Sequence, residues 1–382
     1  MAETAEQHAV PASPEEAAAA LRDAPAPVRI RGGGTKLGSG HPVDAAIEVR
    51  TERLDALLEH NAGDLTAVLQ AGAPLARAEE AFAAAGQMLA LDPPDGRATI
   101  GGVVATADSG PLRHRYGAPR DLVLGVQVAL PDGTVARAGS KVIKNVAGYD
   151  LAKLMSGAFG TLGLVTEVTV RLHPRPAAWC TAVGRSDDPQ LLARAAGELA
   201  HRPLEAEALD LRWEDGAGAV LARFGGPSAG DRAQGALAVL RDQGVEAETA
   251  EDDAALWDAQ RDGQRGPVVV RVSTTQDRLG AVLAAAREHG ARVVARAGHG
   301  LAWMTLPGAG GGDPDATSAI VGQLRAALAP SPCVVLDAPA AVRAALDPWG
   351  PAAEAQLALM RRVKARFDPD GRCNRGLFLG GI

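Results

Sequence analysis

The chain has 382 residues, 47% of them hydrophobic and 3% aromatic, and its formal net charge is −7. Because this length exceeds the size at which one core usually stops growing, two domains are expected. The mild negative charge and the scarcity of aromatic rings argue against a nucleic-acid-binding surface. The three cysteines, Cys180, Cys333 and Cys373, lack zinc-site spacing and are typical of a reducing compartment.

The N-terminal residues carry no cationic start followed by an apolar core, and no apolar run reaches membrane-spanning length. We therefore expect a cytoplasmic protein without a membrane span, which could meet the inner face of the cell membrane only through partners. Residues 1–13 have the composition of a loose tail. A short helix is expected to start at Ser13-Pro14, where the serine caps it and Glu15 and Glu16 lie at its positive end.

Strands and helices are expected to alternate closely from residue 26 to about residue 175. Hydrophobic periodicity and turn residues predict strands at 45–50, 65–72 and 167–172, helices at 53–61 and 74–85, and a hairpin over 122–139 with its turn at Pro131-Asp132-Gly133.

A boundary is expected at His173-Pro174-Arg175-Pro176, after which the pattern changes. From there the order β-α-β-β-α-β occurs twice, with the helical segment 251–262 as a connector, which predicts two ferredoxin-like units in tandem. An amphipathic helix follows and ends at Asp368-Pro369. The expected division is a tail and short helix at 1–25, a first domain at 26–175, a second domain at 176–340, and a returning C-terminal segment at 341–382.

Three consecutive glycines, Gly32 to Gly34, lie between Arg31 and Lys36. Consecutive glycines let peptide N–H groups surround an anion without a Cβ atom in the way, so a phosphate or diphosphate is the expected ligand. The alternative is a mobile surface turn. A P-loop is excluded because no lysine follows a glycine, and the dinucleotide fingerprint fails because Thr35 and Leu37 stand where glycine is required.

Two further glycine-rich stretches support the phosphate interpretation. Residues 91–117 contain Asp92-Pro93-Pro94 and a paired glycine, and Thr99 is placed to cap a short helix whose free N–H groups would favour an anion. Residues 141–170 contain SGAFGTLG directly before a strand. Three such stretches in one domain favour a binding site over a mobile turn.

These stretches carry a family resemblance. Residues 31–37, 92–117 and 144–165 resemble the flavin-binding domain of the vanillyl-alcohol oxidase/PCMH superfamily, also called FAD-linked oxidases. KNVAGYDLAKL, GTLGLVTEVT, DPWG and the tail MRRVKARFDPDGRCNRG resemble especially the FAD-binding E subunits of bacterial glycolate oxidases. The resemblance implies an α+β fold: a PCMH-type FAD-binding domain of two α+β subdomains, with a cap of two ferredoxin-like βαββαβ units.

The resemblance also implies a set of FAD-contacting residues. The diphosphate would be wrapped by Arg31, Gly32, Gly33, Gly34, Thr35, Lys36 and Leu37, and the phosphates and inner flavin edge would face Thr99, Ile100, Gly101 and Gly102. The ring system and ribityl chain would be lined by Pro93, Pro94, Thr106, Ser109 and Gly110, with Arg115 and Tyr116 close by, and the adenosine end by Gly160, Gly163 and Val165.

Two departures from the family pattern matter. Some relatives attach FAD through a histidine in the first glycine loop, where this chain has Thr35 and Lys36, so non-covalent FAD is expected. E-type tails read Asn-Pro-Gly where this chain has Asn374-Arg375-Gly376, which would alter a turn near the flavin.

A hydroxy acid needs a cation for its carboxylate and a base for its hydroxyl. Arg113 and His114 are the candidates that follow Ser109-Gly110, with a solvated basic loop as the alternative. Tyr149, with Lys144 and Asn145, forms a second polar set whose alternative is anchoring of the local loop. No metal site is expected, because His299 has no second histidine nearby in AGHGLAW; Trp303 and Met304 are expected in the core.

The resemblance implies an FAD-binding subunit of a glycolate oxidase or dehydrogenase complex, in which hydride passes from a 2-hydroxy acid to flavin. Electrons would then pass to an iron–sulfur subunit, since three cysteines cannot hold a cluster, beside a homologous FAD subunit. Two alternatives remain: a non-catalytic assembly or electron-relay subunit, and a stand-alone D-lactate or sugar-alcohol oxidase.

Overall fold

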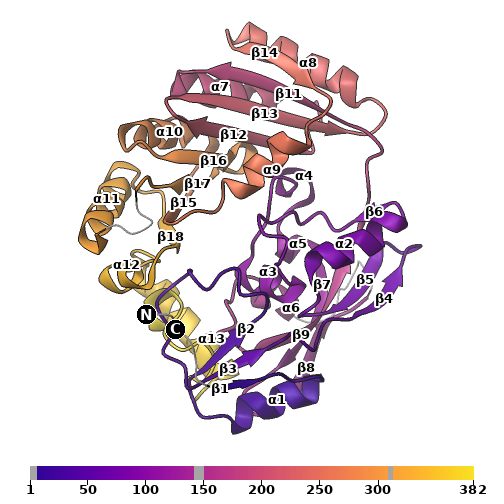
Figure 1. Cartoon of the computed structure of the whole chain (residues 1–382), viewed down its shortest axis with the longest axis vertical. Helices are drawn as coiled ribbons and strands as arrows, with labels where there is room; N and C mark the ends of the chain where they lie inside the picture. Colours follow the sequence, from indigo (N-terminus) through magenta and orange to yellow (C-terminus); the bar gives the residue numbers. More distant parts are fainter. Residues whose placement is uncertain (1–6, 142–149, 309–312) are drawn as a thin grey trace. The chain divides into compact units, whose positions relative to one another are not determined.

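The computed structural model describes residues 7–141, 150–308 and 313–382 (Figure 1). These residues form two compact units. The first contains the chain up to Ser109 together with Gly117–Arg175 and Pro351–Ile382, and the second contains Gly110–Tyr116 and Pro176–Gly350. Each unit is therefore assembled from separate stretches of the chain.

The first unit contains three sheets. A parallel sheet has the order β1-β3-β2, an antiparallel sheet has the order β4-β5-β9-β7-β8, and β10 pairs with β6. The strands are β1 (Gln7–Ala9), β2 (Val28–Arg31), β3 (Ile47–Arg50), β4 (Leu57–Asn61), β5 (Thr66–Gln70), β6 (Gln87–Met88), β7 (Val123–Ala129), β8 (Val135–Gly139), β9 (Leu164–Arg171) and β10 (His173–Pro174).

The helices of the first unit are short, apart from α13 near the C-terminus. They are α1 (Pro14–Asp23), α2 (Leu75–Ala84), α3 (Ile100–Thr106), α5 (Pro119–Leu122), α6 (Leu151–Met155), α13 (Glu354–Phe367) and the single 3₁₀ turn η3 (Leu379–Gly381). The predicted start of α1 is confirmed, since the Ser13 hydroxyl accepts a hydrogen bond from the Glu16 amide at 3.1 Å. The predicted hairpin is confirmed as β7 and β8.

Two expectations for the first unit were wrong. The helix predicted over 53–61 is absent from that segment, where β4 instead forms an edge strand paired with β5. The expected loose tail contains β1, which pairs in parallel with β3. In both cases, hydrogen bonding to a neighbouring strand outweighs the local composition.

The second unit is built on one eight-stranded sheet with the order β14-β11-β13-β12-β16-β17-β15-β18. Its strands are β11 (Trp179–Ser186), β12 (Ala208–Glu214), β13 (Ala217–Gly225), β14 (Glu246–Ala250), β15 (Val269–Ser273), β16 (Arg292–Arg296), β17 (Leu301–Thr305) and β18 (Cys333–Asp337). The two predicted βαββαβ units are therefore both present. They are joined edge to edge by the antiparallel pairing of β12 with β16, which the sequence did not indicate.

Along these strands, alternate side chains pack into two hydrophobic cores on opposite faces of the sheet. One side packs against α7 (Pro189–Ala200), α8 (Ala229–Asp242), α10 (Leu279–Glu288) and α11 (Pro314–Ala327). The other side receives Trp257 from the connector helix α9 (Ala254–Asp262). The unit also contains α4 (Arg113–Tyr116), α12 (Ala340–Ala345) and the single turns η1 (Gln276–Arg278) and η2 (Ala297–His299).

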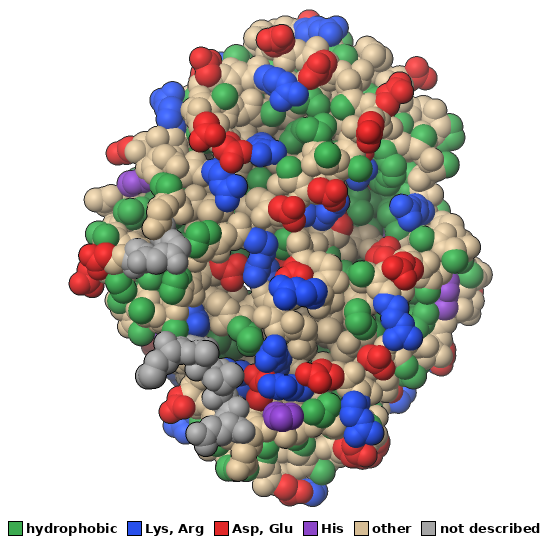
Figure 2. Space-filling view, in the orientation of Figure 1, with side chains coloured by type: hydrophobic (Ala, Val, Ile, Leu, Met, Phe, Trp, Pro, Cys, Tyr) green, Lys and Arg blue, Asp and Glu red, His purple; other side chains and the backbone are tan. Residues whose placement is uncertain are grey.

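Acidic and basic side chains are interspersed on the face drawn in Figure 2, without a large region of one sign. Among the described residues, no helix has both the length and the apolar character needed to cross a membrane.

Candidate functional site

A groove in the first unit brings together three of the predicted stretches. It encloses about 1130 Å³, including the part open to solvent, and its walls come from the loop after β2, from α3, from the loop before β9 and from the C-terminal tail. The predicted cofactor residues that line it are Arg31, Gly32, Gly33, Gly34, Thr35, Lys36, Leu37, Thr99, Gly101, Gly102, Thr106, Gly160, Gly163 and Val165.

The remaining predicted cofactor residues do not line this groove. Pro93, Pro94 and Ser109 belong to the same unit but lie outside the lining, and the Ile100 side chain is fully buried in the core. Gly110, Arg115 and Tyr116 belong to the second unit.

The glycine triplet is required by close packing within the protein as well as by the loop's backbone conformation. A Cβ atom on Gly33 would lie 2.2 Å from the carbonyl oxygen of Arg97, and Gly34 has a φ of +72°, which favours glycine. Within the described ranges, the amide nitrogens of Gly32, Gly33 and Gly34 donate to no protein acceptor. Three successive amides are therefore open to an anion in the groove.

The two cations beside the triplet are both paired with carboxylates. The Arg31 guanidinium lies 3.2 Å from the Glu48 carboxylate, which also binds Arg50 at 2.5 Å. The Lys36 ammonium lies 2.8 Å from the Asp108 carboxylate. These cations therefore reach a ligand only as members of ion pairs.

The start of α3 differs from expectation. Thr99 caps the helix as predicted, because its hydroxyl accepts from the Gly102 amide at 3.3 Å. However, the amides of Ile100 and Gly101 donate to the carbonyls of Ala73 and Ala71. The expected free N–H groups at this helix start are therefore absent, because the preceding loop pairs with the segment after β5.

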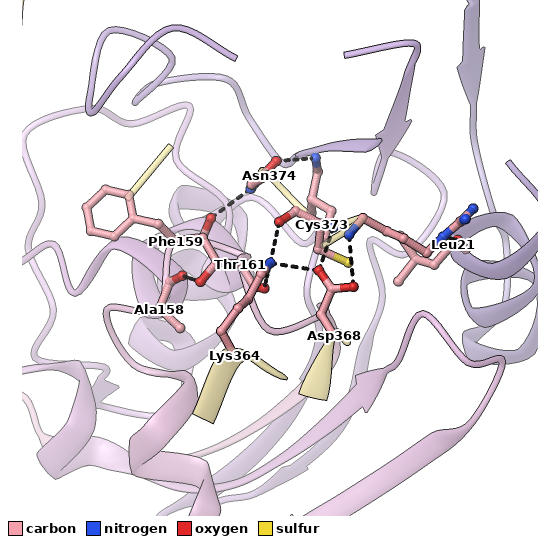
Figure 3. Close-up of polar contacts among 10 residues, drawn as sticks. Leu21, Ala158, Phe159, Thr161, Lys364, Asp368, Cys373 and Asn374 are labelled. Atoms are coloured by element: carbon pink, nitrogen blue, oxygen red, sulfur yellow. Dashed lines mark hydrogen bonds and ion pairs between the residues drawn. The ribbon is translucent and has the colours of Figure 1, made fainter. Parts of the chain in front are cut away.

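The C-terminal tail is joined to the groove through a buried lysine (Figure 3). The Lys364 ammonium of α13 donates to the Thr161 carbonyl at 2.6 Å, to the Asp368 carboxylate at 2.7 Å and to the Cys373 carbonyl at 3.0 Å. All three protons of the ammonium are thus used. Burial and the Asp368 carboxylate raise the pKa of the Cys373 thiol to about 12, so this cysteine is inert at neutral pH.

Asn374 makes the second connection between the tail and the groove walls. Its side-chain oxygen accepts from the Ile30 amide at 2.9 Å, and its side-chain nitrogen donates to the Phe159 carbonyl at 2.7 Å (Figure 3). The residue has a φ of +43°, which asparagine tolerates better than most residues. The sequence had indicated a turn here but not these two bonds.

The proposed substrate-binding residues lie on α4 in the second unit. Burial, and then the nearby His299 and Arg115, lower the pKa of His114 to about 4. Burial and a hydrogen bond to Glu207 raise the pKa of Tyr116 above its usual range. Arg113 occupies the same helix. Tyr149, Lys144 and Asn145 lie outside the described residues.

His299 has a neighbour that the sequence spacing did not reveal. The rings of His114 and His299 are 5.8 Å apart and meet edge to face. The expectation that no second histidine lies near His299 was therefore wrong, because α4 packs within the second unit. In the described part of the chain, these two histidines belong to no group of three potential metal ligands.

Several groove residues had not been singled out from the sequence. They include Asp108, His41, Phe159 and Leu377. Asp108 and Phe159 occur within the glycine-rich stretches but carry no motif of their own. His41 and Leu377 come together through a backbone hydrogen bond of 3.0 Å between segments far apart in the sequence, and no local pattern predicts such a contact.

Comparison with known families matches two of the regions that contribute to the groove. Residues 5–139 match a family described as "FAD binding domain", and residues 351–377 match "FAD linked oxidases, C-terminal domain". These two regions of the chain are homologous to an FAD-binding domain and to the C-terminal domain of FAD-linked oxidases. The first match contains the glycine triplet and α3, and the second contains α13 and Asn374.

Individual relatives match part of the chain. Over 155 residues it is 40% identical to glycolate oxidase subunit GlcE of Escherichia coli, which covers 40% of this chain and 44% of that subunit. Over 169 residues it is 37% identical to a D-lactate dehydrogenase of Archaeoglobus fulgidus, which covers 43% of this chain and 38% of that enzyme. The matched region thus spans less than half of either relative's length.

Solved structures resemble the whole fold. The 4-ethylphenol oxidase of Gulosibacter chungangensis has a TM-score of 0.74 at 16% identity, covering 97% of this chain and 88% of that chain. The p-cresol methylhydroxylase has the same TM-score and coverage at 13% identity. The predicted PCMH-type FAD-binding fold is therefore confirmed.

The cofactor is FAD, and the groove offers donors of the kind that such a cofactor needs. FAD carries a diphosphate near its middle. The groove is bordered by α3, and the open amides of Gly32, Gly33 and Gly34 offer donors for the diphosphate oxygens. The chemistry of the donors therefore fits the cofactor.

Proposed function

We propose that the protein is the FAD-binding subunit of a 2-hydroxy-acid oxidoreductase of the glycolate oxidase type, which converts glycolate to glyoxylate. The observation that carries this proposal is the 40% identity to GlcE across 155 residues. The likeness to a D-lactate dehydrogenase supports the same substrate class, because lactate and glycolate are both 2-hydroxy acids.

We further propose that the protein acts in a complex. Relatives named glycolate oxidase subunit GlcE and glycolate oxidase subunit GlcD both match this chain, which supports a homologous FAD subunit as a partner. The chain has three cysteines, and iron–sulfur clusters usually use four, so an iron–sulfur subunit would take the electrons.

Within the groove, the proposed FAD contacts follow the lining. The amides of Gly32 to Gly34 would hold the diphosphate, the small residues of α3 would let the cofactor lie close to the helix, and Gly163 and Val165 would border the adenosine. Bound FAD supplies the acceptor for the substrate hydride. Attachment without a covalent bond remains the expectation for the first loop.

The substrate-handling roles are proposed for α4. Arg113 would bind the substrate carboxylate, because a guanidinium matches a carboxylate in charge and in geometry. His114 would accept the hydroxyl proton: its lowered pKa keeps the imidazole neutral at neutral pH, and its Nδ1 is buried without a hydrogen-bond partner among the described residues. Tyr116 would keep its proton and hold Glu207 in place.

The test is an anaerobic titration of the purified chain with glycolate, D-lactate and a sugar alcohol, followed by absorbance near the flavin bands. Bleaching of the isolated chain by glycolate supports the proposal. Bleaching only when partners are present assigns the chain to electron relay or assembly. No bleaching under either condition, or bleaching by the sugar alcohol alone, overturns it. Acid precipitation of the same sample shows whether the yellow colour is released, as non-covalent binding requires.

A further inference from the structure

The ion pair between Lys36 and Asp108 joins two walls of the groove. The Lys36 ammonium lies 2.8 Å from Oδ2 of Asp108, and the two side chains are only 17% and 10% exposed. Both residues line the groove. This is therefore not an exposed surface pair, for which water would screen most of the attraction.

The carboxylate is held in place by its own backbone surroundings. Asp108 follows the C-terminal end of α3, where its amide donates to the Val103 carbonyl at 3.1 Å. Its second oxygen, Oδ1, accepts from the Ser109 amide at 3.2 Å. Lys36, in contrast, lies on an irregular loop, so the pair fixes a loop residue to a rigid helix end.

The same loop is also fixed at the other end of α3. There Gly33 packs against the Arg97 carbonyl so closely that a Cβ atom would not fit. The loop therefore runs along α3, a helix of seven residues and about 10 Å, with an anchor at each end. The open amides of Gly32 to Gly34 lie near the Gly33 anchor. The anchor at Gly33 is made of backbone atoms, whereas the anchor at Lys36 is an ion pair between two side chains.

We propose that Lys36 and Asp108 form a latch that holds the 32–37 loop against α3 over bound FAD, and that Asp108 thereby sets the rate at which FAD leaves. This inference rests on the proposed placement of FAD in the groove. Asp108 is a positioning residue in this scheme: it acts through Lys36 and not by contact with the cofactor.

A competing role for Asp108 predicts the opposite result. A carboxylate beside a diphosphate repels it, so replacing Asp108 by a neutral residue would strengthen FAD binding if repulsion dominated. A latch predicts that the same replacement weakens the hold on the loop. The direction of the change in FAD release therefore separates the two roles.

The first experiment measures FAD release from the full chain by the rise in flavin fluorescence after a large dilution into buffer, where rebinding is negligible. We expect Asp108→Asn and Lys36→Met each to speed release about tenfold, and the double variant to be no faster than the faster single variant, because both changes break one interaction. Asp108→Glu should retain slow release. Unchanged or slower release in Asp108→Asn overturns the latch.

A matched control comes from an exposed pair in the same unit. Asp55 lies 3.4 Å from Arg77, and the two side chains are 50% and 71% exposed. Asp55→Asn makes the same chemical change away from the groove and should leave the release rate unaltered. Circular dichroism of every variant establishes that it is folded.

The second experiment needs no cofactor. Trypsin cleaves after Lys36 only when the loop can leave α3, so FAD-free Asp108→Asn should be cut there several times faster than the unchanged protein. Equal cleavage rates overturn the latch. If Gly33→Ala binds FAD as tightly as the unchanged protein, the placement of FAD in this groove fails instead, whatever the trypsin result.

Discussion

The Ile30 amide and the Asn374 side chain lie 344 positions apart in the sequence and are joined by a hydrogen bond of 2.9 Å. Ile30 belongs to β2, which leads into the glycine triplet, and Asn374 belongs to the tail after α13. The same side chain binds the Phe159 carbonyl. One asparagine therefore holds three segments of the groove wall together.

Replacing Asn374 by alanine should destabilise the first unit and weaken FAD binding. Two partly buried backbone groups lose their partners and a positive φ becomes strained, so we expect a loss of about 2 kcal/mol in the free energy of unfolding. Urea unfolding and a fluorescence titration with FAD measure the two effects. Asn61→Ala removes an exposed asparagine side chain in the same unit and should change neither quantity. An unaltered FAD affinity in Asn374→Ala would contradict the prediction.

Replacing Gly33 by alanine should reduce FAD affinity at least about tenfold. The added Cβ would lie 2.2 Å from the Arg97 carbonyl, so the loop would have to move away from α3 and carry the open amides with it. The control is Gly96→Ala, at a nearby position with open space around its Cβ and no positive φ. Equilibrium dialysis against FAD compares them, and equal affinities would count against the role of the triplet.

The stability of the first unit should fall as the pH rises through the range from about 4.5 to 7. Burial and, to a smaller extent, the Asp92 carboxylate raise the pKa of Glu79 to about 7 in the folded protein. The Leu89 amide and Arg175 act in the opposite direction but do not cancel this rise. The folded state therefore holds a proton that the unfolded state has already released, and this contribution to stability is present at acidic pH and lost as Glu79 ionises.

Glu79→Gln should remove this loss, because glutamine cannot ionise. The unfolding free energy of the variant minus that of the unchanged protein should therefore increase by about 2 kcal/mol from pH 5 to pH 8. Glu80→Gln, on the exposed side of the same helix, is the matched control and should leave the pH dependence as it was. Urea unfolding at a series of pH values makes the comparison; parallel curves for Glu79→Gln and the unchanged protein would show that the prediction is wrong.

Glycolate oxidation should stay active at pH values well below the ordinary pKa of histidine. With its pKa lowered to about 4, His114 stays neutral and able to accept a proton down to about pH 5. His114→Gln should lower kcat about a hundredfold and abolish the acid limb near pH 4. His201→Gln alters an exposed histidine in the same unit and should have neither effect. A profile of kcat/KM that falls near pH 6.5 would argue against His114 as the proton acceptor.

Much of the fold could be predicted because local patterns agreed with the tertiary structure. Ser13 and Pro14 start α1, Thr99 caps α3, and the order of elements beyond residue 176 gives two βαββαβ units. The failures came where a distant strand decides the outcome. Residues 57–61 form a strand because β5 is beside them, and the β12–β16 pairing that unites the sheet has no local signature.

The parts of the groove that could be predicted are those whose backbone conformation requires glycine. Glycine runs revealed the loop at 32–34 and the turn at 160–163, both of which line it. Side-chain pairing across the groove was not predictable: Asp108 looks ordinary in the sequence, and the tail motif placed Asn374 near the flavin without indicating its two hydrogen bonds. The pairing of Lys36 with Asp108 and the proximity of His114 to His299 depend on chain segments that only the folded structure brings together.

The return of the last residues to β2 has a consequence for how the protein is made. The groove needs Asn374 and Leu377, which are synthesised long after the glycine triplet that they face across the chain. A growing chain can form the glycine loop and α3 early, but one wall of the groove is missing until residues 374 and 377 have been made. The complete cofactor site therefore cannot exist before that point, and a chain that terminates before residue 374 has no complete site in which to keep its flavin.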